Sequence, residues 1–316
     1  MPGTLTVRPL ILPLAGMAVL AAAPTVLPGS LLIVLHLTFI FTIFAASWDL
    51  LYGYTGQVSL GHGFPFGLGG YFAVLLVILL GAPPWISLPV ASATAAAASL
   101  LLALPSLRLK GMYLAITTLA MAYIAGIVAL ILTTEEGYPG FLTSWPYPME
   151  RFFNGEPLAN YYLGLLLMAG SLFILRRIGG SRMGLRFLAI REDVTVAQSL
   201  GVDVTRHKLT AFFASSFFAG LAGAYYSLFL GHVDYTFFDL SVFFTAAAIV
   251  VVGGVGTIVG AFFGVLVLEG ISLYLGSLGA YRLMIFGALI VVSMRYMPEG
   301  ILGSLRMLGR IRRRKR

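Results

Sequence analysis

Side chains that could carry out covalent or metal chemistry are few in this chain, and their spacing does not fit the common catalytic sites. The sequence contains four histidines, which are His36, His62, His207 and His232. They form neither H-x-x-x-H nor H-E-x-x-H, the spacings that place two zinc ligands on one helix face. The sequence has no G-x-S-x-G motif and no cysteine, so it gives no support to a serine hydrolase or a thiolate site. We therefore expect neither an enzyme nor a metal site.

The lysines exclude the common phosphate-binding loop. They directly follow Leu109, His207 and Arg314. The motif G-x-x-x-x-G-K-[ST] requires a glycine at that position, where the backbone cradles nucleotide phosphates. We expect no cofactor on this chain.

The composition is that of an integral membrane protein. Hydrophobic residues make up 59% of the 316 residues and charged residues 10%, with a mean hydropathy of +0.96. A soluble fold could not bury so much apolar surface. A spanning helix needs roughly 20 apolar residues, so the length allows about ten transmembrane helices. The predicted fold class is therefore an all-α, polytopic helical bundle in one domain, residues 1–316.

Hydropathy divides the chain into ten predicted spans. They are 9–28, 31–51, 64–82, 86–106, 112–133, 159–178, 208–230, 239–254, 257–275 and 282–298. The eighth is short because we divide the 239–275 stretch at Gly253–Thr257, where glycines break a helix.

Arginine and lysine predict the orientation, because they are retained on the cytoplasmic side of short loops. With an N-in/C-in arrangement, only Arg151 and Arg282 of the 20 basic residues fall outside. Eight or ten spans would both satisfy this distribution. The basic tail at 304–316 then lies at the inner leaflet, where we expect contact with anionic membrane lipids and no nucleic acid.

Acidic residues are concentrated in few places. The predicted external loop 134–158 carries Glu135 and Glu136 near its start, which suits either a docking surface or an ordinary solvated loop. At membrane depth only Asp49 and Glu269 are ionisable. Such groups mark ion-coupled transport when present in number, so an autonomous secondary transporter or channel for a small polar solute remains the alternative function.

Two glycine-dense stretches, 52–70 and 253–264, interrupt the apolar background. Glycine lets helices approach closely or breaks them, and broken helices present backbone groups to a substrate. The first stretch also carries Gln57, Ser59 and His62. By the span count, however, 52–63 is a connection at the inner face. A functional interpretation therefore requires this stretch to re-enter the membrane; otherwise His62 is a structural hydrogen-bonding group.

The predicted cytoplasmic loop 179–207 is too polar to span the membrane. Apolar residues nevertheless recur near helical spacing at Leu185, Leu188, Val196 and Leu200, with charged residues between them. This pattern predicts a short amphipathic helix that ends at Gly201 and docks against another protein. A solvated loop is the alternative.

Several motifs in series resemble one known family. They are the segments 50–63 (LLYGYTGQVSLGHG), 107–119 (LRLKGMYLAITTL), 189–193 (AIRED), 253–257 (GGVGT) and 298–303 (PEGILG). Together they resemble the LivM-type permeases of branched-chain amino acid ABC importers, over roughly residues 40 to 303.

The resemblance implies a permease subunit in the plasma membrane of a bacterium or archaeon. Its implied partners are a second related permease chain, two ATP-binding subunits that hold ATP and Mg, and an external substrate-binding protein. The implied contacts with the ATPase, within a coupling loop at 179–207, are Arg186, Ala189, Ile190, Arg191, Glu192, Asp193, Ala197 and Gly201. The implied translocation path contains Gly56, Gln57, Ser59, Gly61, His62, Thr117, Thr118, Gly253, Gly254 and Glu269.

Two departures from the family pattern bear on these expectations. Glu135 and Glu136 stand where the family commonly has a Thr-Gly-Gly-rich turn, and Val196 stands where alanine is frequent. Related permeases carry urea, amides or other small organic solutes, so the resemblance leaves the solute open.

Overall fold

The structure is a computed structural model that describes residues 16–106, 111–134 and 157–274, with 284–285, 287–288, 291–292, 295 and 300–301 near the C-terminus. Throughout these residues the regular elements are helices, which confirms the predicted all-α class. The external loop is described only at its edges, and the basic tail 304–316 lies outside the described residues.

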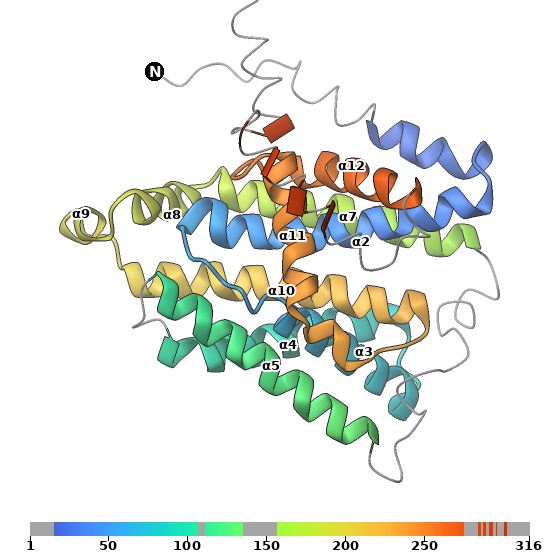
Figure 1. The fold of residues 1–316 in the computed structure, drawn as a ribbon, viewed down its shortest axis with the longest axis horizontal. Helices are drawn as coiled ribbons and strands as arrows, with labels where there is room; N and C mark the ends of the chain where they lie inside the picture. The colour runs from blue at the N-terminus through green and yellow to red at the C-terminus, as the bar shows by residue number, and fades with distance from the viewer. Residues whose placement is uncertain are drawn as a thin grey trace, which may run out of the picture.

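The described elements follow the chain in the order shown in Figure 1. They are η1 (Ala23–Thr25), α2 (Gly29–Asp49), η2 (Leu50–Tyr54), α3 (Gly63–Leu80), α4 (Pro84–Ser106), α5 (Met112–Thr134), α7 (Pro157–Gly179), α8 (Arg182–Glu192), α9 (Val194–Ser199), α10 (Val204–Leu230), η3 (Tyr235–Phe238), α11 (Leu240–Gly253) and α12 (Gly260–Tyr274).

Hydropathy located the membrane helices well. Six helices are long and apolar enough to cross a bilayer, from Leu31–Tyr54 to Val204–Leu230. Three shorter apolar helices cover Gly16–Thr25, Leu240–Gly253 and Gly260–Ser272. The ends of α2, α3, α4, α5, α7, α10, α11 and α12 lie within four residues of the predicted spans. The first span is described only from residue 16 and the tenth only in fragments, so the count of ten and the N-in/C-in orientation remain predictions.

Helix α10 forms the centre of the bundle. It lies between α2 and α7 on one side and α3, α4 and α5 on the other (Figure 1). All residues from 218 to 225 are buried, and most of them are small. A Cβ atom on Gly223 would lie 1.9 Å from the carbonyl oxygen of Phe66 in α3. Glycine therefore allows the two backbones to pack at a distance that no other residue permits.

The predicted break at Gly253–Thr257 is present. Helix α11 ends at Gly253, and α12 begins at Gly260 after a turn in which Gly254, Gly256 and Ile258 have φ values of 117°, 76° and 52°. The 14 residues of α11 extend about 21 Å, which is less than a hydrocarbon core of about 30 Å. Figure 1 shows α11 running across the direction of α2 and α10.

Candidate functional site

Helix α2 continues into a π-helical turn, η2, and the chain then reverses. Gly56 has a left-handed φ of 68°, which turns the chain away from the helix axis. Residues 56–62, called here the 56–62 segment, then lead back into the bundle to the start of α3 (Figure 1). The span count predicted that this stretch is a connection at the inner face. The structure shows instead that it re-enters the helical bundle.

Hydrogen bonds fix the depth of the 56–62 segment. The indole Nε1 of Trp48 donates to the carbonyl of Ser59 at 3.1 Å, and Nε2 of His62 lies 2.9 Å from the hydroxyl of Ser47. Ser47 and Trp48 lie almost two helical turns before Tyr54. The segment therefore runs back beside α2 and its end is buried.

The other side of the segment contacts α5. The backbone N–H groups of Leu60 and Gly61 donate to Oγ1 of Thr118 at 3.2 and 3.3 Å. A Cβ atom on Gly61 would lie 1.8 Å from the carbonyl oxygen of Thr118, so glycine is required for this approach. Thr118 thus satisfies two donors that a buried, non-helical backbone would otherwise leave unpaired.

A small cavity with a mixed polar and apolar lining lies where the segment meets four helices, α3, α4, α5 and α10. Its volume is about 10 Å³, enough for about one water molecule. Its lining residues are Ser59, Gly61, His62, Phe64, Pro65, Ser99, Thr118, Met121, Phe212 and Ser216. Four predicted path residues, Ser59, Gly61, His62 and Thr118, therefore come together around one space.

Two polar groups in this region have no hydrogen-bond partner among the described residues. The hydroxyl of Ser99, from α4, lines the cavity and is 2% exposed. The side-chain amide of Gln57 is also buried, with both its oxygen and its nitrogen unpaired. Buried polar groups are normally paired, so each of these side chains has capacity for a polar ligand.

Sequence reasoning missed the serines of the cavity wall. Ser99 lies in a run of alanines and Ser216 in the apolar middle of α10, and neither position carries a motif. Only the packing of α4 and α10 around the 56–62 segment brings them to the cavity. An isolated serine in an otherwise apolar span was the available signal.

The remaining predicted path residues lie elsewhere. The Thr117 hydroxyl donates to the carbonyl of Tyr113 within α5, away from the cavity lining. Gly253 and Gly254 belong to the turn between α11 and α12, and Glu269 is buried in α12. The structure therefore does not bring these residues to the cavity.

Asp49, one of the two predicted ionisable groups at membrane depth, holds that same turn. Its carboxylate accepts the N–H of Gly256 at 2.6 Å and of Ile258 at 2.8 Å, and its side chain is buried. These bonds join the end of α2 to the turn before α12. They also help to retain the left-handed Ile258, a conformation unfavourable for a β-branched residue.

The predicted amphipathic segment consists of two short helices, α8 and α9, where the sequence predicted one. Asp193 adopts an extended conformation between them, and its carboxylate accepts the N–H groups of Val196 and Thr195. These two hydrogen bonds hold the pKa of Asp193 below its ordinary value of 3.8. Gly201, with φ 80°, follows the end of α9.

The α8–α9 pair has one buried and one exposed apolar face. Phe187, Ile190 and Ala197 are buried against the bundle. Leu185 and Leu200, by contrast, are 66% and 76% exposed. The pair is thus fixed to the bundle and still presents apolar side chains outward, as an uncovered docking surface would.

The charged residues of the pair have different surroundings. Arg191 reaches inward, and its Nη1 donates to the carbonyl of Gly53 at 2.5 Å. Nη1 of Arg186 lies 3.3 Å from Nε2 of His207 at the start of α10, whereas Glu192 is exposed. In the motif Ala189–Asp193, Arg191 therefore bonds inward, Asp193 caps α9, and the side chain of Glu192 is exposed.

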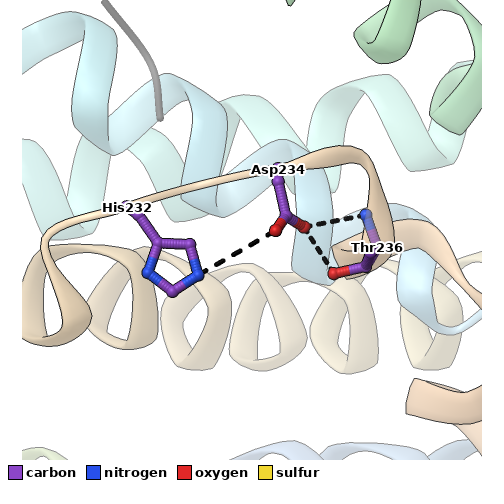
Figure 2. Close-up of polar contacts among 3 residues, drawn as sticks. All are labelled: His232, Asp234 and Thr236. Carbon is purple, nitrogen blue, oxygen red and sulfur yellow. Dashed lines mark hydrogen bonds and ion pairs between the residues drawn. The ribbon is translucent and has the colours of Figure 1, made fainter. Parts of the chain in front are cut away.

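A further polar group lies at the opposite end of α10, in the turn before η3 (Figure 2). The Asp234 carboxylate caps η3 through the N–H and hydroxyl of Thr236, and His232 lies 4.0 Å from its other oxygen. The described residues contain no group of three or more potential ligands that could hold a metal ion. The contacts of Asp234 among these residues are thus those of a local cap on η3.

Over most of its length the chain matches known transport proteins. The profile of the family described as "Branched-chain amino acid transport system / permease component" matches residues 30–294. The high-affinity branched-chain amino acid permease protein LivM of Escherichia coli (strain K12) is 31% identical, over 93% of this chain and 75% of the relative. No solved structure matches the chain.

Two other relatives indicate the breadth of the similarity. The high-affinity branched-chain amino acid permease protein LivH of Salmonella typhimurium is 26% identical, over 83% of this chain and 91% of the relative. The autoinducer 2 import permease LsrC of Klebsiella pneumoniae is 32% identical over 41% of this chain and 37% of the relative.

Proposed function

We propose that this chain, which belongs to the family of permease components of branched-chain amino acid transport systems, forms half of the membrane pore of an ABC importer. The importer would carry branched-chain amino acids or related small solutes. Its apolar helices make it a multi-pass membrane protein, and we place it in the plasma membrane of a bacterium or archaeon. In this assignment the chain has no ATPase activity of its own, and partner subunits hold ATP and Mg.

The observation that carries this proposal is the α8–α9 pair. An importer whose motor is a separate cytosolic protein needs a rigid surface through which a shape change reaches the membrane helices. The pair fits that need, because Phe187 and Ile190 fix it to the bundle while Leu185 and Leu200 remain exposed. We assign the ATPase contact to these exposed leucines together with Val196 and Glu192.

The buried members of the predicted coupling set have another part in this proposal. Ile190 and Ala197 face the bundle and would hold the pair in place, and Asp193 would fix the angle between α8 and α9. The coupling segment thus comprises an outer contact layer and an inner supporting layer.

We further propose that the cavity beside the 56–62 segment is the closed form of the translocation path. Serine and threonine hydroxyls line it next to Phe64, Met121 and Phe212, a mixture suited to a solute with a polar head and an apolar side chain. Its size excludes an amino acid, so transport requires the 56–62 segment to separate from α4, α5 or α10. An external binding protein would deliver the solute, and a related LivH-like permease chain would supply the other half of the pore.

The ATPase contact can be tested with two leucines of similar exposure. Leu200, in the α8–α9 region, is 76% exposed, and Leu80, at the end of α3 on the far side of the bundle, is 73% exposed. We expect Leu200→Glu to abolish co-purification of the ATPase subunits with the co-expressed permease, and Leu80→Glu to retain it. Equal retention by both variants would contradict the assigned surface.

A further inference from the structure

The carbonyl groups at the end of α2–η2 need hydrogen-bond donors from elsewhere in the chain. The last carbonyls of a helix have no partner within the helix and need another donor. Here the chain leaves the axis at Gly56, and the carbonyl of Gly53 receives its hydrogen bond from Arg191, which lies 138 residues later in the sequence. A guanidinium at this position also interacts favourably with the negative end of the helix dipole.

The Arg191 side chain reaches across η2 toward a second element. A Cβ atom on Gly56 would lie 3.3 Å from Cγ of Arg191, so the aliphatic part of the side chain packs on the start of the 56–62 segment. A Cβ atom on Gly256 would lie 3.8 Å from Nη1, so the guanidinium borders the turn between α11 and α12. One side chain from α8 therefore meets both glycine-rich stretches.

Asp49 holds the same turn from the other side. Its two carboxylate oxygens accept the N–H groups of Gly256 and Ile258. Gly53 lies between the two charged residues, because a Cβ atom there would meet Oδ1 of Asp49 at 2.4 Å and the nitrogen of Gly256 at 2.8 Å. Asp49, Gly53 and Gly256 thus form a close backbone junction that Arg191 closes.

The junction lies on a segment suited to change shape. A π-helical turn holds an additional residue relative to an α-helix, and such turns are frequent at functional sites. Leu50–Tyr54 adopts this conformation immediately before the 56–62 segment, which borders the cavity. A displacement of α8 would reach η2 through the Arg191 bond.

We propose that Arg191 is a positioning residue that tethers α8 to the membrane core, so that motion of the coupling segment pulls on η2, the 56–62 segment and the α11–α12 turn. The tether rests on the proposed function, because it presumes that α8 is driven by an ATPase. It assigns Arg191 an inward role, distinct from a charge contact with the partner. Asp49 holds the turn against which the tether acts.

The test uses the complete importer reconstituted in liposomes with Arg191→Ala. The tether predicts that the variant still assembles with the ATPase subunits and hydrolyses ATP within about twofold of the native rate, while solute uptake falls at least about tenfold, as expected for loss of one charge-assisted hydrogen bond. Arg191→Lys keeps a donor and should recover part of the uptake. Arg182→Ala, at the exposed start of the same helix, should leave uptake unchanged.

The other outcomes are equally informative. Unchanged uptake by Arg191→Ala would overturn the tether, and so would loss of the ATPase subunits from a folded variant, because the residue would then be a docking contact. If Arg191→Ala fails to fold, Arg191→Lys decides: a reduced ratio of solute moved per ATP hydrolysed, with the ATPase subunits still bound, supports the tether. A native ratio or loss of subunit binding overturns it. If the native complex shows no ATP-dependent uptake, the proposed function itself fails.

Discussion

Replacing Gly61 by alanine should separate the 56–62 segment from α5. The new Cβ atom would lie 1.8 Å from the carbonyl oxygen of Thr118 and 2.4 Å from its carbonyl carbon, whereas such contacts are essentially never below 3.0 Å. Both atoms belong to helix backbone, so rotation of a side chain cannot relieve the clash. The segment must move by more than 1 Å, roughly the difference between these distances and a normal contact.

The energetic cost has two parts. Overpacking of a close contact costs about 1–3 kcal/mol. The displacement also weakens the bonds from the N–H groups of Leu60 and Gly61 to Thr118, and leaving such a buried donor unpaired costs about 1–3 kcal/mol. We therefore expect Gly61→Ala to destabilise the protein by roughly 3 kcal/mol.

Two variants separate these parts in a thermal denaturation assay of the detergent-purified chain. Thr118→Val removes the acceptor at nearly constant volume, so its cost should be about 1–3 kcal/mol, smaller than that of Gly61→Ala. Gly170→Ala places the same methyl group on α7, where nothing lies within 4 Å, and should be neutral or stabilising by up to about 1 kcal/mol. If Gly61→Ala had the same melting temperature as Gly170→Ala, the close contact between the segment and α5 would be refuted.

Three further predictions concern other sites. The Asp193 cap should be fully present above pH 3.8 and lost as the pH falls through the lower folded-state pKa; at neutral pH, hydrogen exchange in 194–199 should be faster in Asp193→Ala than in Asp193→Asn, and equal rates would refute the cap. Ser99→Ala should not lower the melting temperature, since it removes an unpaired buried hydroxyl, but should alter uptake through the cavity; a clear loss of stability would indicate a missing partner. Gly223→Ala should lower the melting temperature because its Cβ would meet Phe66 in α3 at 1.9 Å, and an unchanged value would contradict the α3–α10 packing.

The sequence predicted the parts of the fold that depend on local composition. Apolar length located α3, α4, α5, α7 and α10 to within a few residues, because each must cover a similar thickness of hydrocarbon. The cluster at 253–257 predicted the break before α12, since glycines there adopt left-handed conformations.

Other features depend on contacts between distant residues. The return of the 56–62 segment into the bundle depends on Ser47, Trp48 and Thr118, and nothing in residues 56–62 themselves reveals these partners. Asp193 could have continued the helix. Its carboxylate instead caps α9, and this divides the predicted single helix in two. Arg191 has the same sequence pattern whether it faces a partner or the carbonyl of Gly53.

The central claim, that this chain is a pore subunit driven by a separate ATPase, is tested most directly by uptake of radiolabelled leucine into proteoliposomes. The assay compares the chain alone with the chain reconstituted with its partner permease, ATPase subunits and binding protein. We predict uptake only by the complete complex with ATP present. Uptake by the chain alone, driven by an ion gradient without ATP, would contradict the account and identify an autonomous transporter.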